Sequence, residues 1–427
     1  TSTDGTHWRN RDVAVAPLPL TGRVVGFPTN HGLYTRRGVM MFPCSLPMAE
    51  PKCIVGHTRY AGVLLSEDGG DTWSWSEPIE AVTWSEMNED PAAFGGETVY
   101  LWEPMLFEHP DGRIGLLIRN STAQDAPERS EKPHRMLLYA ESVDSGRTWT
   151  KARPVELHTL CSRNFAVSGA GVRSSLLMVM NGQDVQVPER INRDRYFLSL
   201  YCSPVCDPDL LLPGPVVQPE GGTAFYPNGF VEDDRLFLGY TYGGVQVSTV
   251  EPLPDVSRPF LLPRGSRPGL RIDGDTALLT HRCSSLGLVL TPALTARKNL
   301  RLSFRFCLDG YNGRHWPLLT LGGTSRNGAV IRVHCNEGAT RDTLQVRTTG
   351  GSWVDLCEVR IGEWQRLDVS LEPTGFRVGL GGEPRRFATP VLRKLCFGGL
   401  YEPSPWPQGV ARSAGRLRLD LSSIDVA

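Results

Sequence analysis

Short apolar stretches alternate with turns rich in glycine, proline and acidic residues along the first 262 positions. Four segments share one plan, an apolar strand, a charged or glycine-rich turn and a second apolar strand: FPTNHGLYTRRGVMMFPCS (27–45), WEPMLFEHPDGRIGLLIRNS (102–121), RNFAVSGAGVRSSLLMVMNGQ (163–183) and FYPNGFVEDDRLFLGYTYGG (225–244). A third strand follows the first two segments, GHTRYAGVLLS (56–66) and HRMLLYAES (134–142). Four-stranded antiparallel units repeating every roughly 50 to 75 residues are typical of propeller blades. We therefore predict an all-β chain that begins with a β-propeller.

A second repeat lies between the third and fourth strands. SEDGGDTW (66–73) and SVDSGRTW (142–149) share the frame Ser-x-Asp-x-Gly-x-Thr-Trp, and STDGTHW (2–8) is one residue short of it. The segment is too short for an EF-hand calcium loop, which needs about twelve residues. Aspartate and glycine favour a tight turn, and tryptophan packs against a neighbouring strand. We interpret the repeat as a structural turn.

The chain begins inside one of these boxes, so residues 2–20 predict only the last strand of a blade. That strand either closes the ring onto the last blade or follows a segment that lies upstream of Thr1. The expected count is five blades, and six if a segment is missing.

The pattern changes after a proline-rich stretch, PLPDVSRPFLLPRGSRPG (252–269). From about residue 270, short strands with period-two alternation are separated by turns at intervals of roughly 8 to 12 residues, which predicts a β-sandwich. We expect a propeller over residues 1–262 and a sandwich (jelly roll) over residues 263–427, where the second domain either supports the propeller or binds sugar.

Charge and cysteine spacing narrow the possible partners. The 45 basic and 46 acidic side chains give a net charge of −1, which does not suit a nucleic-acid partner. No apolar run approaches the roughly 20 residues of a membrane span. None of the ten cysteines has zinc-site spacing, and no cofactor or metal is expected. Cys44 with Cys53, and Cys202 with Cys206, are either loop disulfides or buried thiols.

The boxes between propeller strands resemble those of the sialidase superfamily, or BNR-repeat proteins. The pattern EP-x(5)-PDGR-x(4)-IRN (103–120) is similar to a blade of the sialidase-like hydrolases, and FYPN with YTYG resembles their last blade. GEWQRLDVSLEPTGFRVGLGG (362–382) with KLCFGGLY (394–401) resembles the laminin-G or concanavalin-type jelly roll. The signatures of the invertase and levanase families, which also combine a propeller with a sandwich, are absent.

The superfamily resemblance implies a glycoside hydrolase that removes a terminal, acidic sugar from a glycan. The same superfamily contains non-catalytic binders and lyases, so a carbohydrate-binding propeller and a lyase acting on a uronic acid are alternatives. A secreted or periplasmic location is favoured.

Propeller geometry gathers the starts of the inner strands near one axis, where a polar pocket is expected. Polar residues at these starts and at the ends of the second strands are the candidate substrate-binding residues: Arg119, Arg163, Asn30, Asn164, Asn181, Asn228 and Tyr242. Arg36 is expected at the opposite face. The loops after the second strands, with Asp125, His134 and Asp184, are expected to carry specificity.

Three further residues are the catalytic candidates. Glu103 lies between apolar neighbours, an environment that suits a general acid or base, or it pairs with Arg119 or Arg163 for structure. The resemblance implies that Tyr226 is a nucleophile, and the alternative is a sugar-stacking or core aromatic. His31 is a candidate acid or base, or an oriented hydrogen-bonding group.

Overall fold

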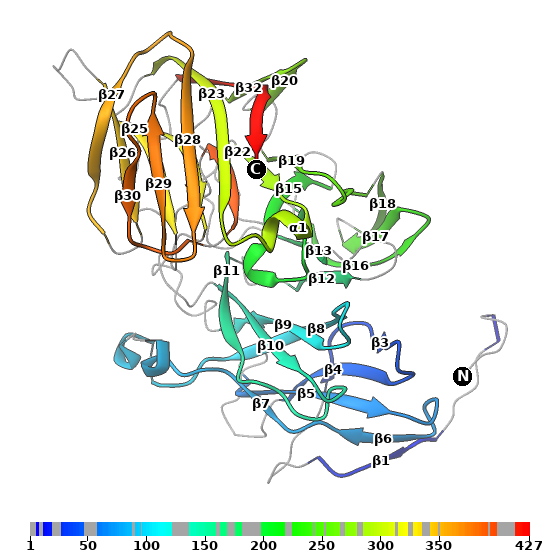
Figure 1. Ribbon diagram of the computed structural model, residues 1–427. Helices are drawn as coiled ribbons and strands as arrows, with labels where there is room; N and C mark the ends of the chain where they lie inside the picture. Colours follow the sequence, from blue (N-terminus) through cyan, green and yellow to red (C-terminus); the bar gives the residue numbers. More distant parts are fainter. Residues whose placement is uncertain are drawn as a thin grey trace. The chain divides into compact units, whose positions relative to one another are not determined.

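The computed structural model describes residues 6–7, 12–18, 27–46, 58–87, 90–94, 96–121, 136–158, 163–168, 176–181, 198–217, 224–241, 244–251, 253–264, 270–279, 285–311, 315–322, 328–334, 342–348, 351–391, 393–398 and 415–427. Strands dominate this part of the chain, as predicted, and its helices are limited to single turns such as α1 (Pro292–Thr295) (Figure 1). No helix in these ranges has the length and apolar character needed to cross a membrane.

The chain divides into two compact units. The first contains Thr1–Pro127, Leu137–Pro154 and Arg163–Ala166, and the second contains Glu128–Met136, Val155–Ser162 and Val167–Ala427.

Two sheets make up the first unit. One has the order β1-β6-β5-β4-β2, with β3 paired to β4 and β7 paired to β5. The other has the order β11-β10-β9-β8. Their bounds are β1 Ala14–Val15, β2 Phe27–Pro28, β3 Leu33–Tyr34, β4 Met40–Leu46, β5 Tyr60–Ser66, β6 Thr72–Trp75, β7 Ile79–Glu80, β8 Leu101–Glu108, β9 Ile114–Asn120, β10 Met136–Ser142 and β11 Arg153–His158.

The two sheets share one hydrophobic core. Alternate residues of β4, β5, β8 and β9, among them Met41, Val63, Leu106 and Leu116, form a single buried cluster with Trp84. The inner strand β8 of the second sheet lies beside β4 of the first. Consecutive antiparallel sheets packed face to face in this way give the first unit a propeller-like arrangement.

Both boxes form turns held by their own side chains. Asp68 accepts hydrogen bonds from the Thr72 hydroxyl (2.6 Å) and from the backbone N–H of Thr72 and Asp71, which lower the pKa of its carboxyl. The Trp73 indole N–H donates to the Gly70 carbonyl (3.0 Å). Asp144, Thr148 and Trp149 repeat these contacts in the second box.

The N-terminal strand does not lie where ring closure would put it. β1 pairs in parallel with β6, the outer strand of the first sheet, through Ala14 opposite Thr72 and Val15 opposite Trp73. The last blade-like sheet, in the described residues, contains only β16, β17 and β18. Of the two alternatives for this strand, closure onto the last blade is not seen in the described residues, where β1 extends the open edge of β6.

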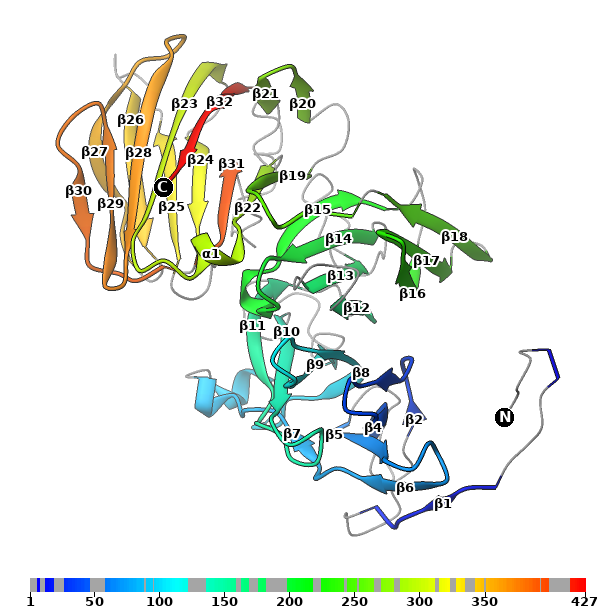
Figure 2. The ribbon, with the colours of Figure 1, turned by 45° about the vertical axis from the view of Figure 1, so that its right-hand side comes forward.

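The second unit contains two more sheets of the same kind. β12 (Phe165–Ser168), β13 (Leu176–Asn181), β14 (Leu198–Ser203) and β15 (Leu212–Val216) form one, and β16 (Phe225–Glu232), β17 (Arg235–Thr241) and β18 (Val245–Val250) form the other (Figure 2). β13 lies beside β16, which repeats the relation of β4 to β8. Four propeller-like sheets are thus described in the whole chain.

The suggested disulfide between Cys202 and Cys206 is not formed in the third propeller-like sheet. Cys202 and Cys206 are both buried free thiols, and burial raises the pKa of Cys202 to about 12. They do not form the loop disulfide. Cys44 is also a free thiol, and its suggested partner Cys53 lies outside the described residues.

The C-terminal part consists of two seven-stranded antiparallel sheets, β19-β22-β31-β24-β25-β26-β27 and β20-β21-β32-β23-β28-β29-β30. Side chains from both sheets, including Phe304, Trp316 and Phe397, form one buried core. The strands are β19 Phe260–Arg264, β20 Leu270–Asp273, β21 Thr276–Leu279, β22 Ser285–Val289, β23 Leu300–Tyr311, β24 His315–Leu321, β25 Ala329–His334, β26 Asp342–Thr348, β27 Val354–Val359, β28 Gln365–Glu372, β29 Gly375–Leu380, β30 Arg385–Phe387, β31 Leu395–Gly398 and β32 Gly415–Val426.

β19 and β22 lie against β15 of the third propeller-like sheet. Two glycines, Gly214 and Gly287, lie at this contact, where a Cβ on Gly214 would come within 3.2 Å of Leu262 and one on Gly287 within 3.4 Å of Leu212.

Candidate functional site

The inner strands of two sheets are interrupted at matching positions. The register between β8 and β9 shifts between Trp102 and Met105, and the register between β16 and β17 shifts between Phe225 and Asn228. One extra residue in a strand forms a bulge and redirects the side chains around it. Glu103 and Tyr226 lie in these bulges, each after an aromatic residue and before a proline.

Both bulge residues have a left-handed backbone. The φ angle is 46° at Glu103 and 57° at Tyr226, a conformation that costs a residue with a side chain free energy and is concentrated at functional sites. The two catalytic candidates therefore hold equivalent, strained positions in their own sheets.

Glu103 is held from three directions. Its backbone N–H donates to the Ser45 hydroxyl (3.0 Å), and its carbonyl accepts from the Asn30 side-chain amide (3.4 Å), which also donates to the Pro104 carbonyl (2.9 Å). Its carboxylate accepts a hydrogen bond from Arg119 Nη1 (2.7 Å). Backbone and side chain of this residue are both fixed.

The surroundings of Glu103 differ from the apolar environment expected from its sequence neighbours. The Glu103 and Arg119 side chains are 10% and 3% exposed and form a buried ion pair. A carboxylate that accepts from a guanidinium has no proton to donate in that contact, so the pair favours a base or a charge-stabilising group over a general acid. Of the two environments considered for Glu103, apolar neighbours or an ion pair with an arginine, the structure contains the ion pair with Arg119.

Three more candidates lie next to this pair. Arg163 donates to the Thr29 carbonyl (2.8 Å), adjacent in sequence to Asn30. The His31 ring lies 5.4 Å from the ring of Phe165, adjacent to Asn164. The first unit thus brings together a set that we call the polar cluster: Asn30, His31, Glu103, Arg119, Arg163 and Asn164.

The polar cluster contains hydrogen-bonding atoms that are not used within the described part of the chain. Asn164 is fully buried, and neither atom of its amide has a partner there. The same holds for Thr29 Oγ1, Asn30 Oδ1 and Arg119 Nε. Buried polar groups normally have partners, so such a concentration is typical of a ligand-binding site.

The remaining candidates lie in the second unit. Tyr226 is 37% exposed and meets the ring of Phe225 edge-on at 5.0 Å. The Asn228 side-chain oxygen accepts from the Gly229 N–H (2.9 Å), and the buried Asn181 amide donates to the Ala224 carbonyl (2.6 Å). Asn181 therefore ties the third sheet to the start of β16. Tyr242 and the specificity loops lie outside the described residues.

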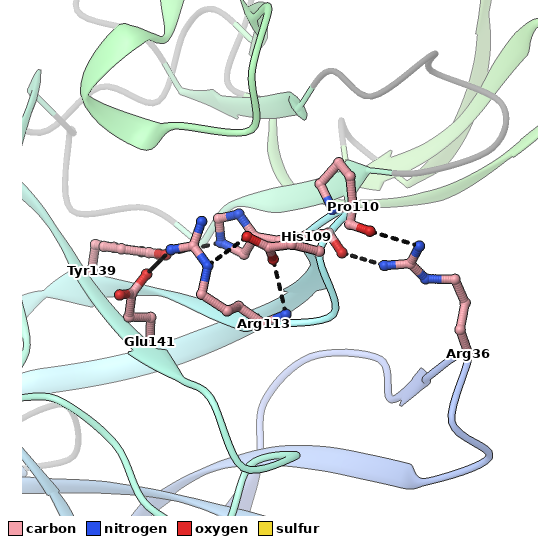
Figure 3. A network of polar contacts seen from close by, with 7 residues as sticks. Arg36, His109, Pro110, Arg113, Tyr139 and Glu141 are labelled. Carbon is pink, nitrogen blue, oxygen red and sulfur yellow. Dashed lines mark hydrogen bonds and ion pairs between the residues drawn. The ribbon is translucent and has the colours of Figure 1, made fainter.

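A second polar network lies at the opposite end of β8 (Figure 3). Arg36 donates to the carbonyls of His109 and Pro110 there, consistent with its expected place on the other face. The buried His109 ring shares a hydrogen bond with the Tyr139 hydroxyl (2.9 Å), which donates to Glu141 (3.0 Å). Burial, followed by nearby Arg113, lowers the pKa of His109. Among the described residues, no group of three or more metal-ligating side chains is present.

Sequence reasoning missed Ser45 and the two bulges. Ser45 ends an otherwise apolar run, MMFPCS, which is the only sign of its role in the sequence. Glu103-Pro104 and Tyr226-Pro227 mark the bulges, because proline cannot donate to a strand ladder and is confined there to edges and bulges.

No protein-family model matches the chain, and no curated protein matches it at a significant level. Among solved structures it is similar to a Trypanosoma rangeli sialidase in complex with 2,3-difluorosialic acid (covalent intermediate), with 11% identity over 92% of this chain and 67% of that chain, at a TM-score of 0.39. It is also similar to another structure named a sialidase, with 12% identity over 95% of this chain and 43% of that chain, at 0.36.

A third similar structure is a protein of unknown function from Dyadobacter fermentans, with 17% identity over 58% of this chain and 61% of that chain, at a TM-score of 0.41. Scores below 0.5 at these identities define neither fold nor activity.

Proposed function

We propose that the protein is a sialidase-like glycoside hydrolase that removes a terminal acidic sugar from a glycan. Glu103 serves as the catalytic carboxylate and Tyr226 as the nucleophile. His31 is a further acid–base group. Arg119, Arg163, Asn30, Asn164, Asn181, Asn228 and Tyr242 are the proposed substrate-binding residues, and no metal or redox cofactor takes part.

The observation that carries this proposal is the shared left-handed backbone of Glu103 and Tyr226 at matching bulges. Glycine and asparagine adopt this backbone at less cost than glutamate or tyrosine. Glu103 supplies a carboxylate and Tyr226 supplies a phenol. A retaining glycosidase with a tyrosine nucleophile requires these two kinds of group.

The charge of the polar cluster supports an acidic substrate. It contains two guanidinium groups, those of Arg119 and Arg163, and a guanidinium can bind the carboxylate of an acidic sugar through two parallel hydrogen bonds. The unused Arg119 Nε and the Asn164 amide are further hydrogen-bonding groups for that sugar.

A non-catalytic glycan-binding protein is the second candidate. It is favoured by the burial of Glu103 against Arg119, because an ion pair closed to the substrate fixes the fold without taking part in chemistry. Both candidates use the same arginines, and they differ in whether a glycosidic bond is cleaved.

We also propose that the chain consists of two domains. Residues 1–262 form a sialidase-like propeller with five blades, and residues 263–427 form a sandwich of the laminin-G type that supports it. The contact of β15 with β19 and β22 favours support over sugar binding for the second domain. A glycan substrate favours a secreted or periplasmic location.

A screen of aryl glycosides and natural glycans with the wild-type protein tests the activity. Glu103→Gln and Tyr226→Phe should each lower kcat at least 100-fold on the best substrate, the scale of losing one catalytic group. Glu108→Gln is the matched control, because Glu108 lies at the other end of β8 and pairs with Arg36 (3.1 Å).

Three outcomes separate the candidates. Binding of an acidic sugar without cleavage, unchanged in Glu103→Gln, supports the non-catalytic protein. An unsaturated product that absorbs in the ultraviolet identifies a lyase. Full activity of Glu103→Gln on a cleaved substrate refutes the role given to Glu103.

A further inference from the structure

We propose that Ser45 is the positioning residue for Glu103, so that the first sheet sets the geometry of a catalytic group carried by the second. This inference rests on the proposed function for its catalytic meaning. Its structural part, that the Ser45 hydroxyl keeps Glu103 in its left-handed conformation, can be tested without any substrate.

The bulge creates the need for such a residue. An extra residue in a strand is left outside the ladder, so the backbone groups of Glu103 lose their cross-strand partners. A buried N–H without a partner is strongly unfavourable. The Ser45 hydroxyl supplies the missing acceptor at 3.0 Å, and both residues are buried.

Ser45 is itself held firmly in the first sheet. It lies in β4, opposite Ala61 of β5 and Phe27 of β2, so its backbone is paired on both sides. Only its hydroxyl reaches β8. A hydroxyl carried by a central strand is a fixed reference point, and a catalytic group held by such supporting contacts keeps its geometry.

The remaining contacts of Glu103 complete the arrangement. Asn30, in the connection between β2 and β3, binds the carbonyl side of the same bulge, and Arg119 from β9 binds the carboxylate. Without the Ser45 hydroxyl, the Glu103 N–H loses its acceptor, and we expect the backbone to leave the left-handed region to regain one. That change would turn the carboxylate away from Arg119.

Ser76 provides a matched control. It is a buried serine of the same sheet region whose hydroxyl also accepts a backbone N–H, that of Val63 (3.0 Å), and it has no contact with Glu103. Ser45→Ala and Ser76→Ala remove the same kind of hydrogen bond. A difference between them at Glu103 therefore comes from position and not from the general loss of a buried hydroxyl.

The first measurement is the crystal structure of each variant. In Ser45→Ala we expect Glu103 to leave positive φ and its carboxylate to separate from Arg119, while both remain in place in Ser76→Ala. Glu103 unchanged in Ser45→Ala overturns the proposal, whatever the activity of the protein.

The second measurement uses the substrate found for the wild type. Ser45→Ala should lower kcat about tenfold or more with KM within twofold, as expected for a misplaced catalytic group, and Ser45→Thr should recover most of it. Equal kcat values for Ser45→Ala and Ser76→Ala refute the positioning role. If the wild type cleaves nothing, the proposed hydrolase fails, while the crystal structures still decide the role of Ser45.

Discussion

Replacing Arg119 with methionine should destabilise the first unit by about 3 to 5 kcal/mol. The Glu103 and Arg119 side chains are 10% and 3% exposed, with 2.7 Å between the paired atoms. Methionine fills much of the volume of the arginine stem but removes the cation, so the carboxylate is left buried and unpaired. Breaking a buried pair in this way costs about 3 to 5 kcal/mol.

The size of the effect follows from burial, and a second ion pair of the same sheet shows the contrast. Arg36 and Glu108 approach to 3.1 Å, but the Arg36 side chain is 59% exposed. Arg36→Met should therefore cost no more than about 1 kcal/mol. Adding Glu103→Gln to Arg119→Met removes the buried charge and should recover about 2 kcal/mol, because a neutral amide is far less costly to bury than a carboxylate.

Urea unfolding followed by tryptophan fluorescence measures these free energies at neutral pH. The double variant must be more stable than Arg119→Met alone. A loss below about 1 kcal/mol for Arg119→Met, or a double variant no more stable than the single one, would show that water reaches the pair and refute the reasoning.

Three further predictions concern the rest of the first unit. Burial lowers the pKa of His109, so the folded protein binds fewer protons than the unfolded chain. The stability of the protein therefore falls as the pH drops below about 6.5. His109→Gln should reduce this pH dependence of the unfolding free energy, measured from about pH 7 to 5. Hydrogen bonds from Thr148 lower the pKa of Asp144, so the stability from this box is complete above the usual aspartate pKa of about 4 and is lost as the pH falls through the lowered value. Asp144→Ala should abolish that acid dependence and lower the melting temperature. A Cβ on Gly115 would lie 2.3 Å from the Phe107 ring, so Gly115→Ala should cost about 1 to 3 kcal/mol in urea unfolding, and Phe107→Leu should relieve part of it.

Much of the fold follows from local pattern. Apolar alternation and the turn residues between strands predicted the all-β chain and its propeller-like sheets, of which five were expected and the described residues contain four. These features depend on residues close together in sequence. The parallel pairing of β1 with β6 did not follow, because nothing in Ala14 and Val15 specifies which open edge they join.

The candidate site could be predicted only in part, for a related reason. The sequence placed Glu103 and Arg119 at neighbouring strand ends and offered their ion pair as one alternative. The Ser45 contact links residues 58 positions apart, and the left-handed backbone arises from a bulge whose only local sign is a proline. Such contacts depend on how two sheets pack, which the pattern of either strand does not contain.

The positive φ angle at position 226 also predicts how a mutant library would behave. If this position were randomised and clones were chosen only for yield of folded protein, glycine and asparagine should accumulate, since they adopt this backbone at about 1 kcal/mol less cost than most residues. Selection for sugar turnover should instead return tyrosine. The divergence between the two pools would report what stability this protein gives up at position 226 in exchange for chemistry.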